Sequence, residues 1–573
     1  MTNPRALLWL ALGLVLWLNV NAWIKDEAKP AAAPPAAESV TTATPENAAA
    51  GSLADELPSV AAESAETAPA AAGETPAVPG ADGDTVAPEE ARIVHIATGV
   101  LDLDLSLAGG ELIRADLPAY PRHKDDLSVP VRLFNTDSKD TRFVFQSGLT
   151  SGEAGRNEPN HKALFSADAT EYRLVQGADT LEVPLRWSDG AGLAVTKTFV
   201  FRRGSYQVDL RYRVENAGAA PVRLASYAQF NRHTQSTERS MFDPETYSFR
   251  GPAYYDGESY QKLDIEDEED RALSRTITGG WVAGMQHHFV AAIVPAAGFA
   301  YRYDVKADQQ DYLLRVVGPA RTVPAGGSAE FAETLFVGPK LQQQLKAAGP
   351  KLELTTDYGW LTFLAKPLFE WILAPIHKFV RNWGLAIIIV TFLIKLVFYK
   401  LSETSGRSMA KMKAVAPRMK SLQERYKDDR EGQARAMMEL YKKEKINPVA
   451  GCLPMLVQIP FFLAFYWVLL ESVEMRQAPF FGWIQDLSAR DPYFILPLLM
   501  GAAMYAQFKL NPTPPDPIQA KVFGFMPVIM TAMFMWFPSG LVLYWLTNTG
   551  LSIAQQWKIN RVVEAETKKH RGG

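Results

Sequence analysis

Hydrophobic residues gather into long runs near the start and in the last third of the chain, and they alternate with polar residues in between. Residues 6–24 form the first run, which as a helix would be about 28 Å long. Five further apolar segments follow, and together they predict six membrane spans. These segments are residues 382–399, 451–470, 493–508, 522–537 and 541–557.

The region between the runs, residues 93–340, has the period-two pattern of β-strands. Residues 101–107 (LDLDLSL) alternate strictly, and Gly109-Gly110 then provides a turn. Further strand-like runs occur at residues 198–201, 206–214, 289–294 and 312–317. The predicted fold is therefore an α-helical polytopic membrane protein that carries a large all-β sandwich domain.

Residues 1–25 contain the first apolar run, for which two interpretations remain open. Its length and the terminal Trp23 favour an uncleaved membrane anchor, whereas Val20-Asn21-Ala22 loosely fits a cleavage site. Residues 26–92 are rich in Ala, Pro and Glu, with 13 acidic and two basic residues. Because this composition cannot bury enough apolar surface, we predict a disordered linker there.

The charges of the loops predict the orientation of the spans, although the whole chain has a net charge of only −4. Residues 400–445 hold 13 basic and seven acidic residues, and the tail at 558–573 holds five basic and two acidic residues. The loop after the 451–470 segment has a net charge of −2. The positive-inside rule then places both termini and residues 400–445 in the cytoplasm, and the β domain outside.

Several polar residues lie within the apolar segments, where burial is costly. Lys395 falls in the 382–399 segment with Thr391 one turn before it, Gln458 lies in the next segment, and Asn548 lies in the last. No acidic residue lies at a comparable predicted depth to pair with Lys395. Since an unpaired cation needs water, the sequence predicts a wet cavity open to the cytoplasm. Snorkelling of the lysine toward water is the alternative.

The 451–470 segment follows Asn447-Pro448 and carries Pro454 and Pro460 beside Gln458. Prolines remove backbone donors, so this helix either packs inside a bundle as a kinked element or borders the polar cavity. The 493–508 and 522–537 segments are 16 residues each. As helices of about 24 Å they are shorter than the hydrocarbon layer, so local thinning of the bilayer is expected.

Four other features have a structural and a functional interpretation. Residues 361–376 resemble an amphipathic interfacial helix, with Leu361, Leu364, Leu368, Trp371 and Ile372 on one face, or else a helix of the sandwich core. Residues 400–445 predict a charged helical hairpin whose methionines pack internally or offer an adaptable surface. His287 and His288, as neighbours on a strand, would point to opposite faces. The acidic run 266–270 predicts a solvated loop.

Candidate enzymatic and metal chemistry is sparse. The only cysteine is Cys452, which excludes an internal disulfide. We find no nucleotide-binding glycine loop, catalytic triad or metal-ligand spacing, so we expect no cofactor and no coupling to ATP.

Three long motifs carry a resemblance to a known family. They are NPVAGCLPMLVQIPFFLAFY (447–466), VEMRQAPFFGWIQDLSARDPYFILPLLMG (473–501) and FMPVIMTAMFMWFPSGLVLYWLTN (525–548). With them, the order of segments resembles the Gram-negative type of the YidC/Oxa family of membrane protein insertases over nearly the whole chain. The resemblance implies a five-span core at 382–557, a linker with interfacial helix at 341–381, and a periplasmic sandwich similar to galactose mutarotases without catalytic activity.

The family also implies site residues and partners. Lys395 stands where many members have arginine, so a bidentate contact is not expected. Thr391, Gln458, Trp536, Tyr544 and Trp545 match groove or substrate-contacting positions, with Pro460 and Asn548 beside them. Implied partners are nascent inner-membrane proteins, the Sec translocon and its accessory subunits, the lipid bilayer and, through 400–445 and 558–573, the ribosome or the signal recognition particle receptor. No DNA partner is implied.

The expected function is therefore insertion and folding of inner-membrane proteins without an energy source, in the bacterial inner membrane. Two alternatives remain: a transporter or channel with a sugar-binding ectodomain, and an anchored carbohydrate epimerase using His287. The first predicts repeat symmetry among the spans, which we do not find. The second predicts an acid and a base in one pocket.

Overall fold

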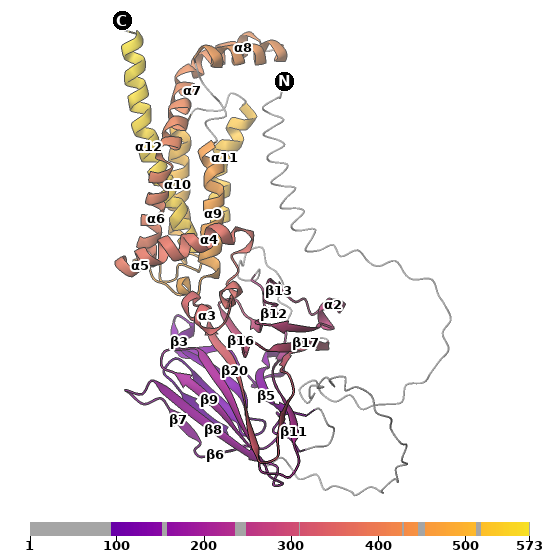
Figure 1. Cartoon of the computed structure of the whole chain (residues 1–573). Coiled ribbons are helices and arrows are strands. Elements are labelled where there is room, and N and C mark those ends of the chain that lie inside the picture. Colours follow the sequence, from indigo (N-terminus) through magenta and orange to yellow (C-terminus); the bar gives the residue numbers. More distant parts are fainter. Residues whose placement is uncertain are drawn as a thin grey trace, which may run out of the picture. The chain divides into compact units, whose positions relative to one another are not determined.

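A computed structural model describes residues 93–151, 157–234, 248–308, 310–426, 429–444, 453–511 and 517–571 (Figure 1). All of these belong to one compact unit within residues 52–573. The predicted anchor, the acidic linker, Asn447 and Cys452 lie outside the described residues, and so does the last part of the tail.

The described part of residues 93–340 folds into two sheets, as the alternating pattern predicts. One sheet has the order β14-β17-β18-β11-β5-β3-β2-β1-β7, with β4 paired to β3 and β19 to β11. The other has the order β13-β12-β15-β16-β20-β10-β9-β8-β6. The strands are β1 Ile93–Ala97, β2 Asp102–Ser106, β3 Glu111–His123, β4 Asp126–Arg132, β5 Phe143–Thr150, β6 Ser166–Ala167, β7 Glu171–Arg173, β8 Thr180–Ser188, β9 Leu193–Arg202, β10 Gln207–Asn216, β11 Val222–His233, β12 Gly251–Tyr255, β13 Tyr260–Lys262, β14 Ser274–Thr278, β15 Trp281–Met285, β16 Phe289–Pro295, β17 Ala300–Asp308, β18 Asp311–Val317, β19 Arg321–Val323 and β20 Gly327–Pro339.

The predicted strand runs are confirmed and pair mostly with their neighbours in sequence. β2 and β3 form an antiparallel pair across Gly109 and Gly110, which both have positive φ angles. β9 and β10 pair around Gly204, also at positive φ, where a glycine is favoured. The inward positions of these strands are buried and the outward ones exposed, so the alternation places one face of each sheet in a common core.

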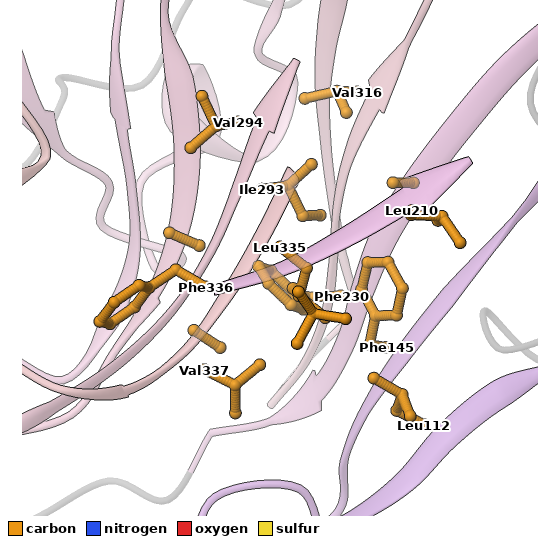
Figure 2. Packing of buried hydrophobic residues seen from close by; sticks show 14 of the residues in the cluster. Leu112, Phe145, Leu210, Phe230, Ile293, Val294, Val316, Leu335, Phe336 and Val337 are labelled. Atoms are coloured by element: carbon orange, nitrogen blue, oxygen red, sulfur yellow. The ribbon is translucent and has the colours of Figure 1, made fainter. Parts of the chain in front are cut away.

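The core of the sandwich is apolar and draws on both sheets. Figure 2 shows Phe145 and Phe230 from one sheet beside Leu335 from the other. Phe145 and Phe230 have ring centroids 6.0 Å apart. Burial of side chains of this size from water supplies the main stabilising free energy of such a domain.

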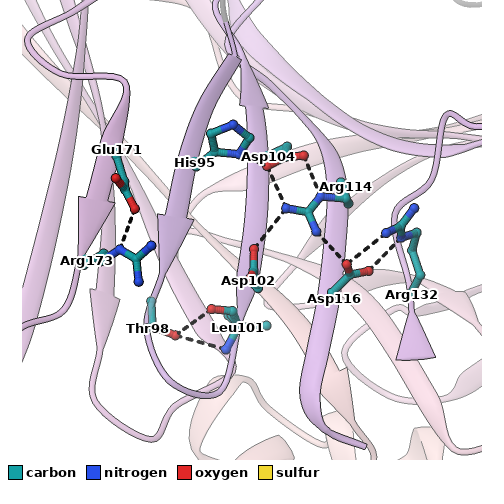
Figure 3. A network of polar contacts seen from close by, with 10 residues as sticks. All are labelled: His95, Thr98, Leu101, Asp102, Asp104, Arg114, Asp116, Arg132, Glu171 and Arg173. Carbon is teal, nitrogen blue, oxygen red and sulfur yellow. Dashed lines mark hydrogen bonds and ion pairs between the residues drawn. The ribbon is translucent and has the colours of Figure 1, made fainter. Parts of the chain in front are cut away.

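A network of charged residues covers the outer face of β2 and β3 (Figure 3). Arg114 contacts Asp102 at 3.0 Å, Asp104 at 2.5 Å and Asp116 at 2.6 Å. Arg132 of β4 reaches the second oxygen of Asp116 at 2.7 Å. The carboxylates and guanidinium groups thus alternate across three adjacent strands and tie them together.

The described remainder of the chain is helical (Figure 1). Short elements in and after the sandwich are η2 Lys139–Thr141, α2 Glu268–Arg271, α3 Gln342–Ala348, η4 Leu352–Thr355 and η5 Gly359–Leu361. The longer region holds α4 Thr362–Pro367, η6 Leu368–Leu373, α5 Ala374–Val380, α6 Trp383–Val397, α7 Tyr399–Arg425, α8 Arg430–Lys443, α9 Leu453–Glu471, η8 Val473–Met475, α10 Ile495–Leu510, α11 Pro517–Phe534 and α12 Ser539–Arg571.

Five of these helices, α6 and α9–α12, coincide with the apolar segments identified in the sequence. Among the described residues, length and composition qualify no individual helix to cross a membrane, whereas α6 and α7 qualify as a pair, with a bend of 69° between them. The six predicted spans therefore stay a prediction. Asn382 caps α6 by accepting a hydrogen bond from the Leu385 amide, which explains where that helix begins.

The predicted interfacial helix is not a regular α-helix along its whole length. The segment is helical, but residues Leu368–Leu373 form a π-helix, whose wider turn shifts the side chains that follow. Leu361 and Leu368 are buried, whereas Trp371 is 75% exposed. The prediction assumed an unbroken 3.6-residue period, which the π-helix interrupts, and the interfacial position of the segment stays a prediction.

The helical hairpin predicted at residues 400–445 is present as α7 and α8, with Asp429 capping α8. Met419 is buried, and Met412 and Met437 pack around it with Leu440 and Tyr441. The Tyr441 hydroxyl lies 3.3 Å from the Met419 sulfur. Internal packing is therefore confirmed for these three methionines, whereas Met438 is 45% exposed.

Candidate functional site

Lys395 lies in the last turn of α6 and is half-buried. Its Nζ donates a hydrogen bond of 2.8 Å to the Ser552 hydroxyl on α12. Within the described residues, no carboxylate lies at ion-pair distance from this ammonium group. Among these residues, the ammonium group therefore has a neutral partner and no counter-ion.

A chain of hydrogen bonds leads from Lys395 to α9. The Ser552 hydroxyl donates to the Asn548 carbonyl oxygen one turn earlier, at 2.8 Å. The Asn548 side-chain amide in turn donates to the Gln458 amide oxygen, at 3.4 Å. Three of the residues singled out in the sequence thus lie in one polar group, which joins α6, α9 and α12.

Thr391 takes no part in that group, although it lies one turn from Lys395. Its side chain is 1% exposed, and its hydroxyl donates to the Ile387 carbonyl of the same helix at 2.7 Å. This bond satisfies the hydroxyl within α6. Contact of Thr391 with a client protein stays a prediction.

Tyr544 and Trp545 lie in an aromatic cluster between α9, α11 and α12. The Tyr544 ring stacks on Phe465 with centroids 4.6 Å apart and is 2% exposed. Trp545 packs edge-on against Phe462 at 4.8 Å and lies 5.4 Å from Phe534. Both residues therefore contribute to helix packing in this structure, and client contact remains a prediction for them.

Trp536 and Pro460 complete the predicted set and lie apart from the polar group. Trp536 is 40% exposed after the end of α11, and the Arg490 guanidinium lies 5.5 Å from its ring centroid. Pro460 is half-buried inside α9, two residues after Gln458. The structure thus gathers Lys395, Gln458 and Asn548, and leaves the other predicted residues around them.

His287 and His288 lie in the turn between β15 and β16 rather than on a strand, so the prediction of opposite faces was wrong. Their rings stack with centroids 3.7 Å apart. Burial and, to a smaller extent, the positive charge of Lys340 lower the pKa of His287 to about 3. His287 is therefore neutral and poorly suited to act as an acid near pH 7.

The acidic run at 266–270 is exposed and partly helical, as α2, with Asp267 as its N-cap. Within the part of the chain that the structure describes, no group of three His, Cys, Asp or Glu side chains could hold a metal ion.

Ser552 is the main residue that sequence reasoning missed. A serine in an apolar helix carries no charge, so by itself it does not indicate a functional site. Its distance of four residues from Asn548 placed it on the same helix face, and this spacing was the available signal.

Comparison with known proteins covers both parts of the chain. Residues 93–371 match the family model described as the YidC periplasmic domain, and residues 375–567 match the model described as 60Kd inner membrane protein. The membrane protein insertase YidC of Thioalkalivibrio sulfidiphilus is 46% identical over 582 residues, covering 99% of this chain and 100% of that protein. The YidC of Pseudomonas putida strain W619 is 44% identical over 579 residues, with the same coverage.

Solved structures give weaker similarities. A crystal structure of an active YidC insertase covers 82% of this chain and 94% of its own at 18% identity, with a TM-score of 0.36. A galactose mutarotase related enzyme from Lactobacillus acidophilus covers 43% of this chain and 97% of its own at 9% identity, with a TM-score of 0.29.

Proposed function

Because this chain belongs to the family of YidC membrane protein insertases, we propose that it guides clients into the bilayer along a hydrophilic, cytoplasm-open groove containing Lys395. The chain is a bacterial inner-membrane protein that inserts membrane proteins, and it is not an enzyme. Its clients are membrane proteins, and it contacts the lipid bilayer. Family membership sets aside the transporter and epimerase alternatives.

The observation that carries the mechanism is the neutral environment of Lys395. Its ammonium group has one hydrogen-bond partner among the described residues, the Ser552 hydroxyl, and an ammonium group has three donors. Within the described part of the chain, two donors of this cation have no partner, and we propose that they attract an acidic group on the polar flank of a client. Attraction is strong in this setting because the effective dielectric constant is below that of water.

The route of the client follows from this attraction. The polar flank enters the groove, and the short helices around it reduce the apolar distance it must cross. The apolar segment of the client then leaves for lipid along α9, past Gln458 and Pro460, and its transfer out of water supplies the free energy. No nucleotide hydrolysis is needed for this step.

The proposed topology has six spans, with both termini in the cytoplasm and residues 26–381 in the periplasm. The charge excess of residues 400–445 and 558–573 supports it. The proposed divisions are an anchor at 1–25, a linker at 26–92, the sandwich at 93–340, the interfacial segment at 341–381, the core at 382–557 and the tail at 558–573.

Proposed partners beyond clients and lipid are the Sec translocon and either the ribosome or the signal recognition particle receptor. The basic hairpin, α7 and α8, supports a contact with ribosomal RNA or acidic protein surfaces.

Insertion into proteoliposomes tests the proposal. Purified full-length protein is compared with Lys395→Ala, Lys395→Arg and Lys395→Glu, using a single-span client with an acidic flank. We expect Lys395→Ala and Lys395→Glu to reduce insertion about tenfold or more, and Lys395→Arg to retain most of it, because it keeps the charge.

Lys509→Ala is a matched control, because Lys509 also lies in the last turn of an apolar helix, α10, but contacts Tyr505 instead of the polar group. Insertion by Lys509→Ala should equal that of the unmodified protein. If Lys395→Glu inserts the acidic client as well as lysine does, electrostatic attraction is not the mechanism.

A further inference from the structure

One face of α12 carries a row of polar side chains that contact four other helices. Four of them stand four positions apart, and the fifth directly precedes one of these, so all lie on one broad face. Their partners are the Gln458 side chain of α9, Lys395 of α6, the Tyr399 and Gly406 carbonyls of α7, and the Leu510 carbonyl at the end of α10. The row consists of Asn548, Ser552, Gln555, Gln556 and Asn560.

Two members of this row contact the two sides of the bend between α6 and α7. Ser552 accepts from Lys395, in the last turn of α6, at 2.8 Å. Gln555, one turn later on α12, donates to the carbonyl of Tyr399, the first residue of α7, at 3.3 Å. The 69° bend lies between these contacts. α12 therefore fixes both the Lys395 side chain and the backbone that follows it.

The hydroxyl of Ser552 is suited to hold a charge without cancelling it. It accepts from Lys395 and donates to the Asn548 carbonyl, so its donor and one acceptor site are used. A carboxylate at this place would hold the ammonium group more strongly but would neutralise it. An apolar residue would leave the flexible lysine stem free to extend toward cytoplasmic water.

We propose that Ser552 is a positioning residue that keeps the ammonium group of Lys395 at the depth of the polar group with its charge available, so that the insertase distinguishes client flanks by charge. Gln555 supports it by fixing the start of α7. This inference rests on the proposed function, because it assumes that Lys395 attracts acidic flanks.

The test compares two single-span clients that differ only in the flank, with two aspartates in one and two asparagines in the other. Full-length protein in proteoliposomes is assayed with Ser552→Ala, Ser552→Thr, Ser552→Asp and Ser552→Asn. The measured quantity is the ratio of acidic to neutral client inserted. A residue that only supports the fold would reduce both clients equally and leave this ratio unchanged.

We expect Ser552→Asp to lower the ratio about tenfold, toward that of Lys395→Ala, because an ion pair neutralises the lysine. Asparagine has nearly the same shape as aspartate but no charge. For Ser552→Asn, the ratio should therefore stay within about twofold of that of the unmodified protein. Ser552→Ala should lower the ratio and Ser552→Thr should restore it, by loss and return of one charge-assisted hydrogen bond. The Asp and Asn pair keeps the test decisive if the alanine variant fails to fold.

Thr547→Ala is the matched control, since the Thr547 hydroxyl also donates to a carbonyl of α12, that of Leu543, without contact to Lys395. It should leave the ratio unchanged. If Lys395→Ala lowers the ratio but Ser552→Asp does not, the role of Ser552 is refuted while the proposed function stands. If Lys395→Ala itself has no effect on the ratio, the proposed attraction of acidic flanks by Lys395 is refuted, and the role of Ser552 falls with it.

Discussion

The Nε2 atom of His287, in the β-sandwich, lies 2.9 Å from the carbonyl oxygen of Leu470 near the end of α9. Because a carbonyl only accepts, the imidazole donates this bond. Ser248 adds a hydrogen bond of 2.7 Å to the Glu471 carboxylate, and Arg476 donates to the Pro121 carbonyl at 2.9 Å. The sandwich is thus joined to the end of α9 by two buried polar contacts, and to the segment that follows α9 by a partly buried one.

The His287 contact predicts an acid-sensitive junction. Its folded pKa of about 3 lies below the usual 6.5, so the unfolded chain binds the extra proton and stability falls as pH drops below 6.5. Between pH 7.5 and 5.5 the loss is about 1.4 kcal/mol. Thermal unfolding of detergent-solubilised protein should show a larger acid-induced decrease for the unmodified protein than for His287→Gln.

Other ionisable groups face His287 and act on the same measurement. Lys340 and Arg476 disfavour its protonation, His288 stacks on it, and the Glu471 carboxylate, 3.9 Å away, opposes them. The variant His123→Gln, at an exposed strand end, is the control and should behave as the unmodified protein. Equal acid sensitivity of His287→Gln and the unmodified protein would contradict the prediction.

The Arg114 network predicts a large difference between two arginines of the sandwich. Arg114→Met removes the arginine that pairs with Asp104 and one of the two arginines that pair with the nearly buried Asp116, and should lower the free energy of unfolding by about 1–3 kcal/mol. Arg173, whose side chain is 73% exposed and pairs with Glu171, is the control. Arg173→Met should change the free energy of unfolding by less than about 0.5 kcal/mol. Urea unfolding followed by tryptophan fluorescence measures both, and equal effects would argue against the network.

The aromatic cluster predicts that Tyr544 acts through its ring. Tyr544→Phe keeps the stack on Phe465 and should leave insertion within about twofold of the unmodified protein. Tyr544→Ala removes a buried ring and should lower the free energy of unfolding by about 3–5 kcal/mol. Insertion assays and thermal unfolding of both variants check this. A marked loss of insertion by Tyr544→Phe, with the fold intact, would instead assign the hydroxyl a part in client contact.

Gly501 allows α10 to approach α11 closely. A Cβ atom there would lie 2.0 Å from the Thr531 hydroxyl oxygen, so Gly501→Ala requires movement and should lower stability by about 1–3 kcal/mol. Gly550 of α12 has open space around it, and Gly550→Ala should be neutral or stabilise by up to about 1 kcal/mol. A lower unfolding temperature for Gly501→Ala and an unchanged or higher one for Gly550→Ala would confirm the close approach of α10 to α11. Stabilisation of both variants would exclude it.

Regular periodicity made the architecture predictable from the sequence. The alternation in residues 101–107 placed β2, and the apolar runs placed α6 and α9–α12, because side-chain burial follows the period of each element. The prediction failed where the period changed, at the π-helix Leu368–Leu373, and where two histidines left the strand for a turn.

The polar group was predictable only in part, for a different reason. Lys395, Gln458 and Asn548 are conspicuous in apolar segments because each is costly to bury. The contact between Lys395 and Ser552 joins residues 157 positions apart, and it depends on how α6 packs on α12. Such pairing depends on tertiary structure, which local patterns do not encode.

The continuity of α12 has a consequence for how the polar contacts change. At 33 residues the helix is about 50 Å long, more than the roughly 30 Å hydrocarbon layer, and it carries its polar row as one body. A rotation of α12 about its axis moves Asn548, Ser552 and Gln555 by the same angle. The contacts to α6, α7 and α9 are therefore mechanically coupled, and they form or break together rather than one at a time.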